Sequence, residues 1–95
     1  MQNRPFTIRK GQQTDVPAAM KLIKELAEYE KAADEVTATV ESMTIDGFGN
    51  QPHFEMWVAE MDDSIVGLAL TYMRYSTWKG KMLYLEDIVV TESAR

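Results

Sequence analysis

The sequence contains no cysteine and a single histidine, His53, which has no other potential metal ligand clustered around it. The missing cysteine excludes disulfide bonds, thiolate nucleophiles and thiolate metal sites. No apolar run approaches the ~18 residues of a membrane-spanning helix, and the N-terminal residues MQNRPFTIRK lack the apolar stretch of a signal peptide. We therefore expect a cytoplasmic protein that does not enter a membrane.

Basic residues are also scarce, with ten Lys and Arg against 15 Asp and Glu, and the formal net charge is −5. This balance speaks against nucleic acid or an anionic membrane surface as a partner. It is compatible with a cationic small molecule. Acidity that only aids solubility explains the charge equally well.

The 95 residues suffice for one small domain, and their patterning predicts a mixed α/β or α+β fold. Alternation predicts strands, and apolar residues at helical spacing predict helices. Gly67, inside an expected strand, suggests a bulge or a close backbone approach. The expected elements are a strand over 5–10, a helix from about 15 to 31 or 33, a short helix over 39–44 ended by Gly47 and Gly49, and strands over 54–61, 65–75 and 82–90 with turns at 62–64 and 76–81.

The strand MLYLEDIVV over 82–90 is apolar on both sides, yet it carries Glu86 and Asp87 in its middle. Successive strand residues face opposite sides of a sheet, so each carboxylate needs its own surroundings. Three explanations remain open. One carboxylate meets solvent and the other an amide or an arginine; the pair binds a metal, although no histidine assists; or the pair belongs to an active site at a break in the sheet.

A second unexpected carboxylate occurs near the end of the first helix. On a helical wheel Glu30 falls on the same face as Leu26 and Ala27. Either the helix has left the core by residue 30 and Glu30 is solvated, or this carboxylate has a function.

Several stretches together resemble one family. They include TIRKGQQTD at the start, LIKELAEYEK over 22–31, DGFG over 46–49, IVGLALTY over 65–72 and YSTWKGKMLYLEDIVV over 75–90. The chain resembles the N-terminal half of a GNAT-type N-acetyltransferase, and in particular the branch that acetylates polyamines and thialysine-like diamines. The resemblance covers nearly all of residues 1–95. It implies a single partial domain with a mostly antiparallel sheet, in the order strand, two helices and three strands.

The resemblance also implies roles for individual residues. Acetyl-CoA, the co-substrate, would bond through its pantetheine arm to the backbone of Ile88, Val89 and Val90 beside a bulge in this strand. Glu86 would face the acceptor amine, a small molecule, and help to deprotonate it. The other amine-binding residues would be Tyr29, Glu30, Trp78 and Asp87, and no metal is implied.

Parts of the family pattern are not found in this sequence. The glycine-rich turn that holds the CoA pyrophosphate would begin at about Arg95, and the later asparagine and tyrosine of the family site are absent. We therefore do not expect robust catalysis by these 95 residues alone. Two hypotheses follow: one half of an acetyltransferase, completed by a second chain or by a longer native product, or a non-catalytic half-domain that self-associates, as a homodimer, through its exposed last strand. A weaker third possibility is a polyamine-binding module without chemistry.

Overall fold

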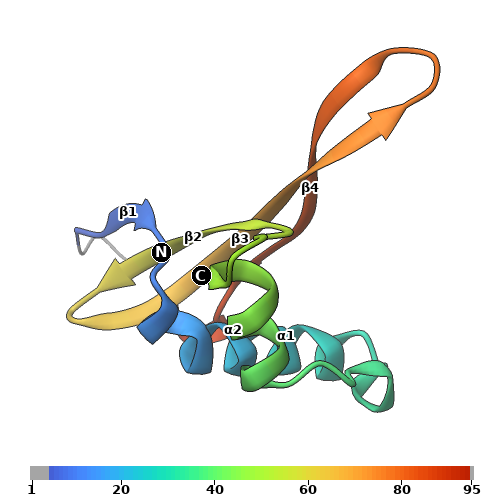
Figure 1. The fold of residues 1–95 in the computed structure, drawn as a ribbon. Coiled ribbons are helices and arrows are strands. Elements are labelled where there is room, and N and C mark those ends of the chain that lie inside the picture. Colours follow the sequence, from blue (N-terminus) through green and yellow to red (C-terminus); the bar gives the residue numbers. More distant parts are fainter. Residues whose placement is uncertain (1–4, 95) are drawn as a thin grey trace.

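The computed structural model describes residues 5–94, and four antiparallel strands in it form one sheet in the order β1-β2-β3-β4 (Figure 1). Each strand pairs with its neighbour in sequence, so the sheet is an up-and-down meander after β1. The β2–β3 turn has two residues, Asp62 and Asp63, both with positive φ (52° and 63°), as tight hairpins favour. The strands are β1 (Thr7–Lys10), β2 (Glu55–Met61), β3 (Ser64–Ser76) and β4 (Gly80–Val90).

Two helices connect β1 to β2: α1 (Val16–Tyr29) and α2 (Val40–Phe48). Two short 3-10 turns precede and follow α1, η1 (Gln13–Asp15) and η2 (Ala33–Glu35), and a third, η3 (Glu92–Ala94), follows β4. Thr39 caps α2 by accepting a hydrogen bond from the Ser42 amide, as expected for a threonine at this position. The prediction that Gly47 ends this helix was wrong. The helix continues through Gly47 to Phe48 because the cap and the packing of Met43 outweigh the ~1 kcal/mol cost of one helical glycine.

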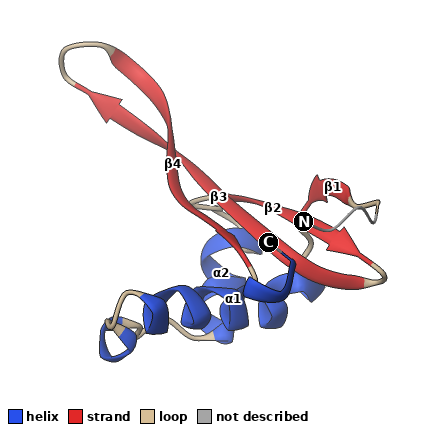
Figure 2. Ribbon diagram, turned by 180° about the vertical axis from the view of Figure 1, so that it is seen from behind, coloured by secondary structure: helices blue, strands red, loops and turns tan. Residues whose placement is uncertain are grey.

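Both helices lie on the same face of the sheet (Figures 1 and 2), and the core lies between them and the strands. The apolar stripe of α1 supplies one side of this core and alternate residues of β2, β3 and β4 supply the other. The core consists of Val16, Ala19, Met20, Leu22, Met43, Met56, Val58, Leu68 and Val89. No helix within residues 5–94 is both long and apolar enough to cross a membrane.

The β3–β4 hairpin extends well beyond the rest of the sheet (Figure 1). Strand β2 pairs with β3 only as far as Thr71, so from there β3 has β4 as its only described neighbour. The rings of Tyr72 and Tyr84 face each other across this arm with centroids 5.3 Å apart, and the Arg74 guanidinium lies 5.4 Å from the Tyr84 ring centroid. Such contacts stabilise a two-stranded ribbon that has no helix behind it.

Strand β4 differs from the expectation for a strand that is apolar on both sides. It forms an edge of the sheet, and among its apolar side chains only Val89 is buried. The reason is that, within residues 5–94, both helices cover one face and no strand follows β4.

Candidate functional site

A bulge interrupts β4 at the two carboxylates. Leu70 of β3 lies opposite Asp87, and Thr71 lies opposite Leu85, so Glu86 has no partner on β3. Glu86 is therefore the extra residue of a β-bulge, a feature that often occurs next to active sites. The expectation of a bulge in this strand is confirmed.

The bulge changes which side chains of β4 face the helices. Tyr84 and Asp87 lie opposite Tyr72 and Leu70, two residues that share a face of β3. In a regular strand, residues 84 and 87 would face opposite sides, since their separation is odd. One inserted residue thus turns Asp87 toward the helices, while Ile88 faces away from them and is 67% exposed.

The two carboxylates have different surroundings. Glu86 is exposed and Asp87 is half-buried. The hydrogen bonds and ion pairs found among residues 5–94 involve neither carboxylate. Among the same residues, no three His, Asp or Glu side chains gather closely enough to hold a metal ion. What the bulge offers is one accessible carboxylate on an edge strand.

The uncovered face of the sheet carries a shallow apolar groove beside the bulge. It has a volume of about 110 Å³, with small residues along its floor. At Gly67 an added Cβ would lie 3.1 Å from the Cβ of Ala59, so a side chain at this position would crowd Ala59 and fill part of the groove. The glycine also follows a second bulge, where Val66 of β3 is skipped in the pairing with β2, as its position in the sequence suggested. The groove is lined by Ile8, Trp57, Val58, Ala59, Gly67, Leu68, Ala69, Ile88, Val89 and Val90.

The predicted cofactor-binding segment, residues 88–90, borders this groove. Val89 points into the core, whereas Ile88 and Val90 line the groove from the edge of the sheet. The segment therefore combines a side chain that anchors the strand with two that shape an apolar surface.

The predicted amine-binding residues Tyr29 and Glu30 lie where α1 ends. Tyr29 is the last helical residue and is 75% exposed, and Glu30 is the exposed C-cap residue, whose amide donates to the Leu26 carbonyl. The structure places Glu30 in solvent at the end of the helix, and its role in binding an amine stays a prediction. A carboxylate there needs no special compensation.

Trp78 does not lie with the other predicted residues. It is 93% exposed in the turn at the tip of the β3–β4 arm, where the hydroxyl of Ser76 accepts hydrogen bonds from its amide and that of Lys79. The strand from Gly80 to Glu86 alone covers about 20 Å. Within one chain, Trp78 and Glu86 are thus well separated.

Two features of this region were not predicted from the sequence. One is the groove, which the alternation of small residues in Ala59, Gly67 and Ala69 could have indicated, since all three share a sheet face. The other is a contact between Glu25 of α1 and the segment after β4. No sequence pattern indicates that contact, because it joins residues 66 positions apart.

Comparison with known proteins agrees with the fold and identifies relatives. The family model described as the acetyltransferase (GNAT) family matches residues 18–95. Thialysine N-epsilon-acetyltransferase of Bos taurus is 42% identical over 96 residues, covering 93% of this chain and 56% of the relative. Spermidine/spermine N(1)-acetyltransferase-like protein 1 of Homo sapiens is 40% identical over 95 residues, covering 93% of this chain and 14% of the relative.

Solved structures share the fold at lower identity. A possible acetyltransferase from Clostridium difficile 630 superposes with a TM-score of 0.71 at 17% identity, over 95% of this chain and 60% of that one. The aminoglycoside N-acetyltransferase AAC(6')-Iy in complex with CoA gives 0.68 at 20% identity, over 97% and 59%. The chain thus spans little more than half the length of the thialysine relatives and of these structures.

Proposed function

This chain belongs to the acetyltransferase (GNAT) family, and we propose that it forms the amine-facing half of an acetyl-CoA-dependent N-acetyltransferase. The acceptor in this proposal is a small cationic amine of the polyamine or thialysine type, and the place of action is the cytoplasm. One observation above all supports it: the bulge in β4 exposes Glu86 directly beside the segment expected to contact the acyl donor. The relatives that are about 40% identical carry thialysine or spermidine/spermine in their names.

The reaction requires a base near the amine. An alkylammonium group with a pKa of about 10.4 is mostly protonated at neutral pH and has no lone pair for attack. A carboxylate within hydrogen-bond reach, directly or through one water, can accept the proton as the amine enters. Glu86 suits this role because it is accessible and because no described side chain or amide already occupies its oxygens. A covalent enzyme intermediate is not needed.

The residues next to Glu86 fit an acyl-CoA. Strand β4 is an edge of the described sheet, so one side of its backbone is open at Ile88. The apolar groove bordered by Ile88 and Val90 suits a largely uncharged arm better than it suits a charged group. Bound there, acetyl-CoA would supply the activated acetyl group.

Further carboxylates would select the amine by charge. Asp87 lies next to Glu86 and faces the helices, and Glu30 is accessible at the end of α1. A second ammonium group of a diamine would be attracted by either carboxylate, whereas a monoamine would not gain this interaction. Tyr29 would contact the alkyl chain or the cation, and Trp78, which lies far from Glu86 within one chain, would do so from a second copy.

The experiment that tests this function begins with titration calorimetry of acetyl-CoA into the 95-residue protein, followed by acetylation assays with spermidine and thialysine. Micromolar binding by the 95-residue protein is expected if its association rebuilds the phosphate site, and transfer is expected from a version of the domain that includes the rest of the family fold. In that longer version Glu86→Gln should lower the transfer rate at pH 7, with partial recovery at high pH as the amine deprotonates by itself. Glu41→Gln, which removes an exposed carboxylate on α2, serves as the matched control. Absence of transfer to either amine by the longer version, or an unaltered rate in its Glu86→Gln variant, would overturn the assignment.

A non-catalytic alternative has its own supporting observation. Strand β4 runs for 11 residues along the edge of the described sheet, and long apolar edges pair readily with another strand. The chain would then be a half-domain that forms a homodimer through β4. Sedimentation over a range of protein concentrations, together with the calorimetry, separates the two functions. Association without acetyl-CoA affinity would favour the half-domain.

A further inference from the structure

The carboxylate of Glu25 joins the middle of α1 to the segment that follows β4. Its Oε1 atom accepts a hydrogen bond from the hydroxyl of Thr91 at 2.8 Å, and its Oε2 atom accepts one from the backbone N–H of Glu92 at 3.0 Å. The segment lies beside α1 where the chain leaves the sheet (Figure 2). One carboxylate thus holds two consecutive residues.

This contact occurs directly after the last rung of the β3–β4 pairing. The amide of Thr91 donates to the carbonyl of Val66 at 2.8 Å, and β4 ends at Val90. Beyond this point no strand holds the described chain, and the contacts with Glu25 are among those that fix how it turns away. The amide of Glu92 opens η3, and a carboxylate acceptor at such a position replaces the missing backbone partner.

From this geometry we infer that Glu25 is a positioning residue for the acyl-CoA-facing end of β4. The inference rests on the proposed function, since it assumes that residues 88–90 contact the acyl donor. Glu25 does not touch the donor or the amine in this assignment. It acts through Thr91 and Glu92, by fixing the position of the strand end next to them.

The nature of the two bonds predicts which substitutions matter. Alanine at position 25 removes both acceptors. Glutamine can retain both contacts, because its carbonyl oxygen accepts from the Glu92 amide and its NH₂ group donates to the Thr91 hydroxyl. Glu25→Gln should therefore resemble the unaltered protein, although it lacks the charge. Thr91→Val removes one bond with nearly the same shape.

Glu28→Gln is the matched control for charge. Glu28 is exposed on the same helix, one turn after Glu25, and the described hydrogen bonds and ion pairs do not include its side chain. Its substitution removes the same charge from α1 without touching the segment after β4.

The test has two arms in the 95-residue protein. Hydrogen exchange, read by NMR, should show the Glu92 amide exchanging roughly tenfold faster in Glu25→Ala, and close to the unaltered rate in Glu25→Gln and Glu28→Gln. Calorimetry should show the Kd for acetyl-CoA rising about five- to tenfold in Glu25→Ala and less in Thr91→Val. In a longer version of the domain that includes the rest of the family fold, the KM for the amine should change by less than about twofold in either variant, because one lost contact at the donor side leaves the amine side intact.

Several results would overturn the inference. Unchanged exchange at Glu92 in Glu25→Ala would show that Glu25 does not hold the segment, and thermal unfolding of the same sample would reveal any general loss of fold. Faster exchange with an unchanged Kd would remove the link to the donor. An equal rise in Kd in Glu25→Gln and Glu28→Gln would assign the effect to charge. If the unaltered protein does not bind acetyl-CoA, the proposed function fails and the donor arm fails with it, whereas the exchange arm still decides whether Glu25 holds the strand end.

Discussion

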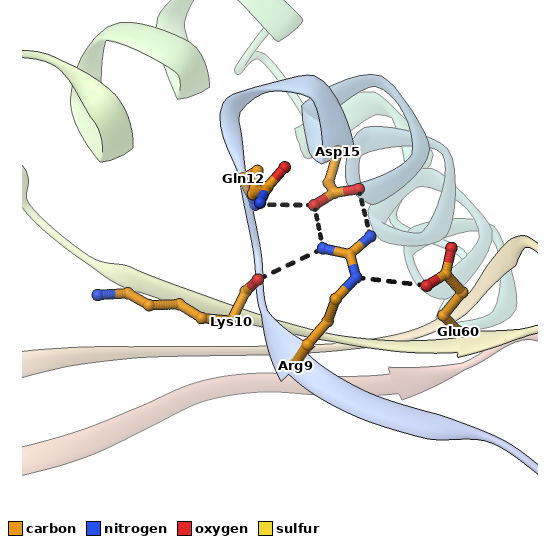
Figure 3. A network of polar contacts seen from close by, with 5 residues as sticks. All are labelled: Arg9, Lys10, Gln12, Asp15 and Glu60. Carbon is orange, nitrogen blue, oxygen red and sulfur yellow. Dashed lines mark hydrogen bonds and ion pairs between the residues drawn. The ribbon is translucent and has the colours of Figure 1, made fainter.

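The guanidinium group of Arg9 donates two hydrogen bonds to the carboxylate of Asp15, over distances of 2.8 and 3.0 Å (Figure 3). Asp15 also accepts a 2.7 Å hydrogen bond from the backbone N–H of Gln12, and Arg9 reaches Glu60 of β2 at 3.4 Å. These contacts join the end of β1 to the start of α1. They hold the start of α1, the helix that packs against β3 and β4.

The Arg9–Asp15 pair makes stability depend on pH. The hydrogen bonds from Arg9, followed by that from the Gln12 amide, lower the pKa of Asp15 below its ordinary value. A carboxyl group whose pKa is lowered on folding stabilises the native state above its unfolded pKa of about 3.9. That contribution is lost as the pH falls through the lower folded value. Arg9, whose pKa is raised chiefly by the hydrogen bond to Asp15, stays charged throughout this range.

Asp15→Asn should therefore destabilise the protein by about 1–3 kcal/mol at pH 7, because a nearly buried carboxylate loses charge-assisted hydrogen bonds. The difference from the unaltered protein should shrink as the pH is lowered below about 4. Urea unfolding at several pH values between 3 and 7 measures the loss of stability at pH 7 and its decrease at low pH. Asp46→Asn, at an exposed position of α2, should show no such difference. A deficit that is constant with pH would contradict the role of the ionised pair.

Deleting Glu86 tests the bulge. Without this residue the alternation of β4 becomes regular, and either the Tyr84 side or the Val89 side of the strand must change face. Loss of Val89 from the core alone should cost about 1.5–3 kcal/mol, whereas Glu86→Gln, which keeps the residue count, should stay within about 0.5 kcal/mol. Chemical denaturation of both variants measures these changes in the free energy of unfolding. Equal stability of the two would mean that the register does not depend on the extra residue.

Glu30→Ala tests selection of diamines. If Glu30 attracts the distal ammonium group, its loss should raise KM for a diamine several-fold and leave kcat nearly unchanged, since the interaction is made equally in the ground and transition states. Steady-state kinetics with a diamine and a monoamine of equal chain length measure this. Glu28→Ala removes a nearby exposed carboxylate and controls for general charge. Equal effects on both amines would contradict the assignment.

The order and type of the main elements followed from local patterns, because α1 and β2 each bury one face and the turn at Asp62 and Asp63 separates β2 from β3. Two details could not follow from them. The length of α2 depends on whether the helix continues through Gly47, and the free-energy cost of one helical glycine is small enough for other contacts to outweigh it. The exposure of β4 depends on what covers the sheet, and local sequence carries no information about that.

Individual site residues were harder to predict than the fold. The bulge at Glu86 was expected only through the resemblance, since LEDIVV has no glycine to mark it. The helical wheel places Glu30 on the apolar face of the first helix. In the structure α1 stops at Tyr29 and the chain turns through Lys31, whose φ is 58°, so Glu30 lies outside the helix. The contact of Glu25 with residues 91 and 92 depends on the packing of α1 beside β4.

Trp78→Ala tests the most distant of the proposed amine contacts. The side chain is 93% exposed at the tip of the arm, so the free energy of unfolding should change by less than about 0.5 kcal/mol. If Trp78 contacts the amine, KM for a diamine should nevertheless rise several-fold, as expected for loss of an aromatic contact with a cation. Trp57→Ala is a useful contrast, because Trp57 lines the groove on the sheet and should affect stability or acyl-CoA affinity instead.

Since the arm holds Trp78 about 20 Å from Glu86 in one chain, a KM effect would have to arise through a second copy, and it should weaken when the protein is diluted below its association range. An unchanged KM at high protein concentration would remove Trp78 from the amine site.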